Sequence, residues 1–422
     1  MTDQFTTHLP TVLYIDINSC FATIEQQAHP KFQGKPLAVA AYETGNGVIL
    51  AASYEAKKFG VTTGMRVSDA KRLCPSILIT TPDPEKYRFV NERLKELVLF
   101  YSPHVQVQSI DEMIVRMDQT PYLAGYMDTE SSVVNRMRCL ATEIKQRIRE
   151  EIGDRITVSI GIAPNAFLAK TASNLKKPDG LEEITAGNIK KVLDSLQLTD
   201  LCGIKQGNGG RLRAHGITTP LGMYESTPEE VERAFGSIMG RYWWLWLHGF
   251  EIGSIYVEKQ NDIRKSYSQS SSLSCPTTPK DSRTIQVIYQ LVAKMAARFR
   301  DDGCSAGGIM AGCSFSDRTY WQKHVTLQKT LYATEDLFSS LMHLFSYAPM
   351  KPIRTVFVGT FNMTTDLYAQ MTLDEEELQK QARTKAIDSI CHKFGQNSIM
   401  SGITVQAKQK IVDRIAFGKS SL

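Results

Sequence analysis

Three acidic residues stand inside short runs of apolar, strand-forming residues. Asp16 lies within Val12–Ile17, and the adjacent pair Asp111 and Glu112 lies within Val107–Val115. An acid in an apolar strand is costly to bury unless a partner compensates its charge. Carboxylate oxygens suit hard cations such as Mg²⁺, and two such ions can drive phosphoryl transfer. Alternatively, Asp16 caps a strand end and Asp111-Glu112 form an ordinary hairpin turn, where acids are common.

Hydrophobic periodicity and turn signals predict the elements that would position these acids. We expect strands at 11–18, 36–41, 48–52 and 156–162, and two more within 105–117. We expect helices at 21–29, 54–59, 67–73, 85–101, 132–152 and 165–176. This order gives the split βαβ pattern of a ferredoxin-like sheet. On such a sheet Asp16 and the Asp111-Glu112 hairpin lie on neighbouring central strands, although adjacent strand residues face opposite ways.

The second half of the chain divides into a helical segment and a further mixed module. Residues 186–250 are predicted to be helical, and a glycine-rich turn near 203–210 can offer main-chain N–H groups to a phosphate. The polar stretch 252–274 is typical of a tether. The module that follows has predicted helices at 282–301 and 334–346 and predicted strands at 306–315, 321–329 and 352–361. A last helix is expected at 378–394.

Composition and charge narrow the class of protein. At 422 residues the chain is long enough for two to four globular domains. It has no apolar run of about 18 residues, so no membrane span is expected. Its first residues do not resemble a signal peptide. The eight cysteines are scattered without a Cys-x-x-Cys pair, which favours reduced thiols in a cytoplasm over a zinc site.

Positive charge is concentrated in residues 264–365. Twelve lysines and arginines stand there against six acids, an excess of six, whereas the formal net charge of the whole chain is +5. A basic module attached to a near-neutral body is typical of polyanion binding. A solvated surface with extra lysine and arginine is the alternative.

Five sequence blocks occur in order: YIDINSCF at 14–21, SYEAKKFG at 53–60, SIDE at 109–112, VSIGI at 158–162 and KKPDG at 176–180. Together with the glycine turn near 203–210, they resemble the Y-family (translesion) DNA polymerases of the bacterial polymerase IV and V group, the ImpB/MucB/SamB type. The resemblance spans roughly residues 10–365. Single blocks are suggestive, and in this order and spacing they are highly specific.

The resemblance implies an α+β fold arranged as a right hand. A ferredoxin-like palm would comprise residues 1–19 and 83–185, small fingers 20–82, and a helical thumb with a helix-hairpin-helix 186–250. A linker at 251–265 would lead to a separate α+β little-finger domain at 266–365, which grips DNA in this family. Residues 366–422 would form a tail. The charge excess in 264–365 agrees independently with the little-finger assignment.

The resemblance also implies an activity. The chain would be a template-directed DNA polymerase of low fidelity, acting in DNA damage tolerance and the SOS response. Asp16, Asp111 and Glu112 would bind two Mg²⁺ ions, which Mn²⁺ can replace, with the Ile17 carbonyl as a further ligand. Primer–template DNA and dNTPs would be its partners, and we expect a cytoplasmic monomer.

The resemblance places six residues around the nucleotide: Ser19, Cys20, Phe21, Tyr54, Lys57 and Lys177. Phe21 matches the steric gate, whose ring lies under the incoming sugar and would clash with a 2′-hydroxyl. A core phenylalanine is the alternative. Tyr54, Lys57 and Lys177 match contacts to the triphosphate, and three converging donors suit a polyanion. On sequence alone, each lysine could also be a solvated surface charge.

The chain departs from the family pattern at several positions, two of which lie at or next to predicted site residues. Lys57 stands where many members have arginine. A lysine ammonium cannot contact phosphate in the bidentate manner of a guanidinium, so weaker nucleotide binding is expected. Asn18 stands where aspartate is common. Little cost is expected there, because that side chain is not a metal ligand in the family.

Gln370–Asp374 (QMTLD) resembles the pentapeptide that binds sliding clamps, with Asp374 in place of the final aromatic. Such a segment can bind a groove on folding, and a plain linker is the alternative. Two other functions are considered. A catalytically silent scaffold that binds DNA and a clamp should have lost the metal carboxylates. Another two-metal palm enzyme, such as a nucleotide cyclase, would need neither the basic module nor a gate at Phe21.

Overall fold

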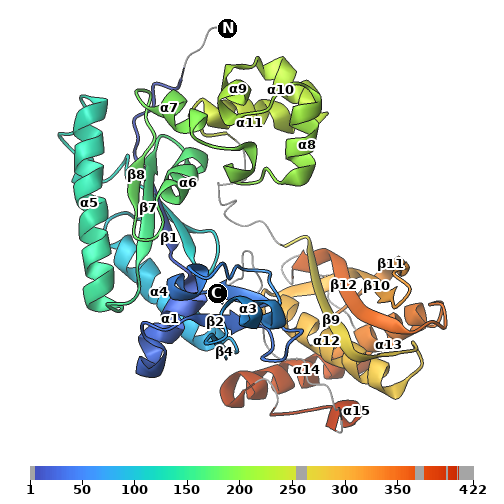
Figure 1. Cartoon of the computed structure of the whole chain (residues 1–422). Coiled ribbons are helices and arrows are strands. Elements are labelled where there is room, and N and C mark those ends of the chain that lie inside the picture. The colour runs from blue at the N-terminus through green and yellow to red at the C-terminus, as the bar shows by residue number, and fades with distance from the viewer. Residues whose placement is uncertain (1–4, 253–263, 366–374, 396–397, 406, 408–422) are drawn as a thin grey trace. The chain divides into compact units, whose positions relative to one another are not determined.

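The computed structural model describes residues 5–252, 264–365, 375–395, 398–405 and 407 (Figure 1). These residues fall into two compact units that divide between residues 258 and 259. The first unit holds all the predicted site residues. The second holds the basic module and the last helices.

A five-stranded sheet is the centre of the first unit. Its strands are β1 (Val12–Ile17), β5 (Val105–Val107), β6 (Glu112–Arg116), β7 (Val158–Ala163) and β8 (Leu181–Glu183). They lie in the order β5-β6-β1-β7-β8. β1 pairs antiparallel with both β6 and β7, and β8 adds a parallel strand beside β7. The ferredoxin-like order and the neighbouring positions of β1 and β6 are confirmed.

Different helices cover the two faces of this sheet. Residues such as Leu13 and Ile15 pack into one core with α1 (Cys20–Ala28), α4 (Pro84–Leu99) and α5 (Glu130–Glu151). Tyr14 and its neighbours pack on the other side with α6 (Ala166–Leu175). Figure 1 shows α5 and α6 on opposite sides of the strands. A Cβ on Gly161 would meet the Ala169 carbonyl oxygen at 1.9 Å, so this glycine lets α6 approach β7 closely.

Two smaller groups of elements complete the first unit. A three-stranded sheet, β3-β2-β4, has its own core with α2 and α3; their bounds are β2 (Leu37–Ala40), β3 (Ile49–Ala52), α2 (Tyr54–Lys57), α3 (Val67–Leu73) and β4 (Leu78–Thr80). The helical group comprises α7 (Ile189–Asp194), α8 (Gln206–Ala214), α9 (Pro220–Glu225), α10 (Pro228–Phe235) and α11 (Met239–Leu247). Trp243 and Trp246 of α11 pack against Phe167 of α6.

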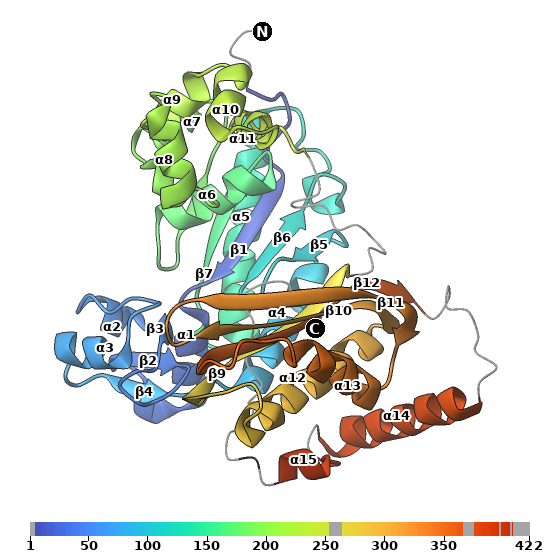
Figure 2. The same cartoon turned by 90° about the vertical axis from the view of Figure 1, so that its right-hand side faces the viewer.

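A four-stranded antiparallel sheet is the centre of the second unit. Its order is β11-β10-β12-β9, with β9 (Ser266–Thr277), β10 (Cys304–Phe315), β11 (Tyr320–Leu331) and β12 (Ile353–Thr365). The helices α12 (Ser282–Asp301) and α13 (Thr334–Phe345) share its core, and Figure 2 shows them on one side of the strands. The predicted helices and strands of this module are present, with longer strands than expected.

The expected tether is wrong for residues 266–274, because they form most of β9. Serine-rich sequence has little preference for strands, which is why the pattern was missed. β9 lies at the sheet edge and pairs with β12 alone. Its side chains alternate, with Tyr267 buried and Ser266 and Ser268 exposed. The long partner strand supplies hydrogen bonds that local propensity does not reveal. Most of the predicted linker, 251–265, lies outside the described residues.

The second unit ends in α14 (Glu375–Phe394) and α15 (Gly402–Val405). Ion pairs hold α14 to α12 and α13: the Arg300–Asp388 contact is 2.6 Å and the Lys380–Asp336 contact is 3.8 Å. The clamp-like segment Gln370–Asp374 lies outside the described residues. All eight cysteines are free thiols. No helix in the described part of the chain is long and apolar enough to cross a membrane.

Candidate active site

The three acids meet at one end of the two central strands. Asp16 of β1 and Glu112 of β6 are direct partners across the strand pair. Both lie on the sheet face of Tyr14, because strand side chains alternate. Asp111 precedes β6, and its main-chain oxygen accepts a hydrogen bond of 2.9 Å from the Ile17 N–H. Since Asp111 belongs to the turn, strand alternation does not force it away from Glu112.

Burial makes two of these carboxylates, Asp16 and Asp111, hard to ionise. Desolvation raises the pKa of Asp16 from 3.8 to about 6; Lys177 opposes the rise, and the charges of Glu112 and Asp111 add to it. Desolvation also raises the pKa of Asp111, against a hydrogen bond from Ser109. A cation would relieve the desolvation cost and the mutual repulsion of such acids. The donor set, three hard oxygen ligands, therefore fits divalent ions.

Two lysines compensate the acids in this structure. The Lys177 ammonium lies 2.8 Å from Asp16. On α6, Lys170 lies 2.7 Å from Glu112 and donates to the Tyr14 hydroxyl at 3.1 Å. Burial lowers the pKa of Lys170, but Glu112 and neighbouring groups raise it by more, so the net shift is upward. Among the described residues, no group of three or more acidic, histidine or cysteine side chains is arranged as a ready-made cation site.

A second cluster, Ser19, Tyr54 and Lys57, lies close to the acids. Lys57 donates to the Ser19 hydroxyl at 2.7 Å, and its ammonium is 4.4 Å from the centre of the Tyr54 ring. Desolvation, then the charge of Lys177, lowers the pKa of Lys57. Desolvation is also the main cause of the raised pKa of Tyr54. The structure thus brings Tyr54, Lys57 and Lys177 to one edge of the acid cluster.

Ser19 has an unusual main-chain conformation. Its φ of 50° and ψ of 41° lie in the left-handed region, which is uncommon for residues other than glycine. It stands between β1 and α1, where the chain turns from the strand with Asp16 into the helix with Phe21. Strained residues of this kind are frequent at functional sites.

Phe21, which the sequence predicts as a site residue, lies in the core. Its side chain is only 3% exposed, and its ring stacks on Tyr87 of α4 with centroids 4.5 Å apart and planes 8° apart. The Tyr87 hydroxyl donates to the buried Glu25 at 2.8 Å, and Lys86 contacts the same carboxylate at 2.8 Å. The ring position is therefore rigidly fixed. Cys20 is also buried, so its side chain belongs to the core.

Sequence reasoning missed two residues that position the acids. Lys170 had a usable signal, because it is the only charged residue in the apolar run 166–172. Asn91 had none, since it lies between Val90 and Glu92 of α4 and belongs to no recognisable motif. Its fully buried amide donates to the Ile110 carbonyl at 2.9 Å and so holds the turn that carries Asp111.

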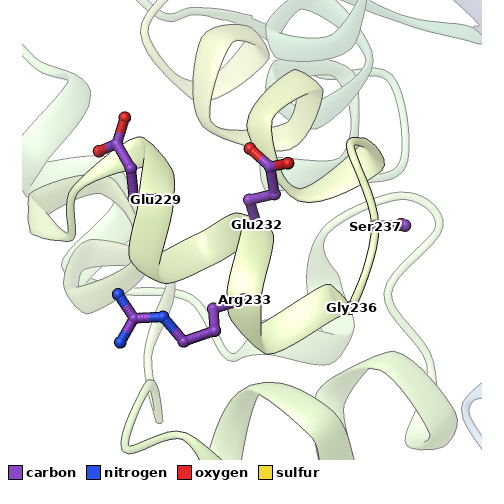
Figure 3. Close-up of a pocket in the computed structure, with 5 residues that line it drawn as sticks. All are labelled: Glu229, Glu232, Arg233, Gly236 and Ser237. Carbon is purple, nitrogen blue, oxygen red and sulfur yellow. The ribbon is translucent and has the colours of Figure 1, made fainter.

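A shallow hollow on α10 contains none of these residues. Figure 3 shows its lining: Glu229, Glu232, Arg233, Gly236 and Ser237. Glu229 is partly compensated by Arg241, 4.0 Å away. The hollow is distinct from the acid cluster, so it is not the candidate active site.

Two family models match this chain. The impB/mucB/samB family model matches residues 15–174, and the model of that family's C-terminal domain matches residues 264–373. Together they cover well over half of the sequence. The chain therefore belongs to the impB/mucB/samB family, which places it among the Y-family polymerases.

Named relatives agree with the family match. DNA polymerase IV 1 of Halalkalibacterium halodurans is 28% identical over 399 residues, which cover 93% of this chain and 92% of the relative. DNA polymerase IV of Staphylococcus aureus is 28% identical over 366 residues, 86% of this chain and 98% of the relative. The protein is accordingly a DNA-directed DNA polymerase of the translesion class.

Solved structures show the same fold. A chimaera of Y-family DNA polymerases superposes with a TM-score of 0.68 at 24% identity, covering 84% of this chain and 99% of the other. An insertion ternary complex of the Dbh DNA polymerase has a TM-score of 0.57 at 24% identity, with the same coverage. The α+β polymerase architecture expected from the sequence is confirmed.

Proposed function

We propose that Asp16, Asp111 and Glu112 hold two Mg²⁺ ions, with the Ile17 carbonyl as a further ligand. The observation that carries the proposal is the closeness of three carboxylates, Asp16 and Glu112 on paired central strands and Asp111 in the adjoining turn; the pKa values of Asp16 and Asp111 are raised. When bound, such ions activate the primer 3′-hydroxyl and stabilise the leaving pyrophosphate, and Mn²⁺ can replace them. A silent scaffold would have no use for this set of acids.

Lys57, Lys177 and Tyr54 would bind the triphosphate. Lys177 contacts Asp16, so its ammonium must exchange that carboxylate for phosphate oxygens when the nucleotide binds. The exchange is favourable, because charge-assisted contacts to a triphosphate are strong and a cation can take over the carboxylate. Lys170, which is held between Glu112 and Tyr14, would keep Glu112 oriented during the exchange.

Phe21 would act as the gate against ribonucleotides. Phe21 follows Asp16 by five residues. Its ring cannot move aside freely, because it is stacked on Tyr87 and buried among apolar side chains. A rigid ring discriminates by clash, since close-packed interiors do not yield to an added hydroxyl. Ser19 and Cys20 would line the nucleotide site mainly through their main chain.

The second unit would bind the primer–template duplex. Its charge excess supports this role, because phosphate neutralisation dominates the affinity of proteins for DNA. We further propose that Gln370–Asp374 contacts a sliding clamp and that the protein acts as a cytoplasmic monomer. Loss of clamp-dependent processivity after deletion of 370–374 is the expected result, and retained processivity would contradict that part.

Binding of Mg²⁺ tests the metal site without relying on activity. The melting temperature of the wild type should rise as Mg²⁺ is titrated, since a ligand of the folded state stabilises it. Asp111→Ala should lose most of the rise. Asp154→Ala, which removes an exposed acid elsewhere in the same unit, is the matched control and should behave like the wild type. An equal rise in all three proteins would contradict the proposal.

A further inference from the structure

Asn18 joins the strand of Asp16 to the loop of Lys177. It follows β1 directly and is 1% exposed. Its side-chain oxygen accepts a hydrogen bond of 2.8 Å from the Asp179 main-chain N–H and one of 3.2 Å from the Thr157 hydroxyl. Its amide nitrogen donates to the Ser159 hydroxyl at 2.9 Å. One buried side chain thus connects β1, β7 and the loop 176–180.

The orientation of this amide follows from its neighbours. A main-chain N–H can only donate, so the group that faces Asp179 must be the side-chain oxygen. The amide nitrogen then faces Ser159, whose hydroxyl also accepts from the Gly180 N–H at 3.3 Å. Asn18 therefore contacts the loop twice: directly at Asp179, and through Ser159 at Gly180.

The loop itself is built to keep one shape. Asp179 has a φ of 57°, in the left-handed region, and a Cβ on Gly180 would meet the Lys176 carbonyl oxygen at 1.8 Å. From α5, Lys145 donates to the carbonyl oxygens of Asp179 and Gly180 at 2.6 and 3.2 Å. Arg149 of α5 pairs with the Asp179 carboxylate. Helix α5 holds one side of the loop, and Asn18 holds the side nearest Asp16.

We propose that Asn18 is a positioning residue for Lys177, and through it for the triphosphate of the incoming nucleotide. The inference rests on the proposed triphosphate contact of Lys177. Asn18 stands two residues after Asp16 in the sequence. Its single buried amide therefore fixes the position of the Lys177 loop relative to Asp16. This role differs from metal binding, which explains how a residue that is no metal ligand can still matter to nucleotide binding.

Steady-state insertion kinetics of the full chain, with Asn18→Ala, test the inference. We expect the KM for dNTP to rise about tenfold with kcat within about threefold, because a shift of the lysine by a fraction of an ångström weakens its contacts. Asn18→Asp keeps an acceptor for the Asp179 N–H and should restore the KM to within about threefold of wild type.

Asn165→Ala is the matched control for loss of stability. Asn165 is also fully buried and makes three side-chain hydrogen bonds, to Trp246, Phe250 and Leu168, none of them in the Lys177 loop. It should lower the melting temperature by a similar amount and leave the KM for dNTP unchanged. An equal rise of KM in Asn165→Ala and Asn18→Ala would overturn the inference.

A double-mutant cycle with Lys177→Ala separates this inference from the proposed function. If Asn18 acts through Lys177, the double variant should match Lys177→Ala within about twofold in KM, since interacting sites are not additive. If the two changes in KM multiply in the double variant, the inference about Asn18 is overturned. It is also overturned if Asn18→Ala leaves KM unchanged while Lys177→Ala clearly raises it. Neither result contradicts the proposed role of Lys177. An unchanged KM in Lys177→Ala overturns the proposed role of the lysine itself.

Discussion

The acidic and basic halves of the candidate active site are built in different ways. Asp16 and Glu112 are fixed by strand pairing in the central sheet, and Asp111 lies in the adjoining turn. Lys57 ends the short helix α2 with its side chain exposed, and Lys177 stands in a loop. The difference shows that positions fixed by the sheet suit ligands that must not move. Lysines on a helix end and a loop can exchange partners.

The largest effect is expected from loss of an acid. Glu112→Ala should lower the single-turnover rate of nucleotide insertion by at least about a thousandfold, because charge stabilisation in the transition state depends on the metal-holding set. Glu182→Gln changes an acid on β8 of the same sheet and should retain most of the activity. Comparable rates for wild type and Glu112→Ala would contradict the proposal that Glu112 is a fixed metal ligand.

The next largest effect concerns the sugar. Phe21→Ala should raise the use of ribonucleotides relative to deoxyribonucleotides by about a hundredfold, because the clash with the 2′-hydroxyl disappears. Tyr87→Phe keeps the stacking ring, loses the hydroxyl with its bond to Glu25, and should change discrimination by less than about threefold. Competition assays with paired nucleotides measure both. Unchanged discrimination in Phe21→Ala would assign the ring to the core alone.

Much of this architecture follows from the sequence. The apolar runs around Asp16 and around Asp111-Glu112 predict paired strands, and their pairing is what brings the acids together. The missed features have a common cause. β9 depends on its partner strand, and Lys170 and Asn91 act across elements that are distant in the chain. Periodicity describes one element at a time, so contacts between elements escape it.

Asn18 shows the same limit more sharply. The sequence comparison with the family marks it only as a departure from aspartate with little expected cost. Its contacts with Ser159 and Asp179 become visible only when β7 and the loop 176–180 are placed beside β1.

The pH dependence of the stability should reveal the cost of burying the charged form of Asp16. The folded-state pKa of Asp16, about 6, exceeds its ordinary 3.8, so the folded protein binds more protons between these values. The contribution of Asp16 to the stability of the wild type should therefore fall as pH rises from about 4 to about 6. Asp16→Asn lacks this loss and should be more stable above pH 6 by about 2 kcal/mol, with no advantage below pH 4. Denaturant titrations across pH measure the difference, and parallel curves would contradict it.

The smallest effect is expected in the basic half. Lys57→Arg should lower the KM for dNTP by about two- to threefold, because a guanidinium can contact phosphate oxygens in a bidentate manner. Insertion kinetics on an undamaged template measure this. A higher KM would show that the present contacts of Lys57, with Ser19 and the Tyr54 ring, matter more than a bidentate contact to phosphate.

The central claim is that these three acids are the catalytic ligands of a template-directed polymerase. Single-nucleotide extension of a labelled primer–template with Mg²⁺, comparing wild type with Asp111→Ala, tests it most directly. The wild type should add the templated dNTP, and the variant should bind the same DNA without extending it. Equal extension by both proteins, or DNA binding without any templated extension by the wild type, would contradict the claim.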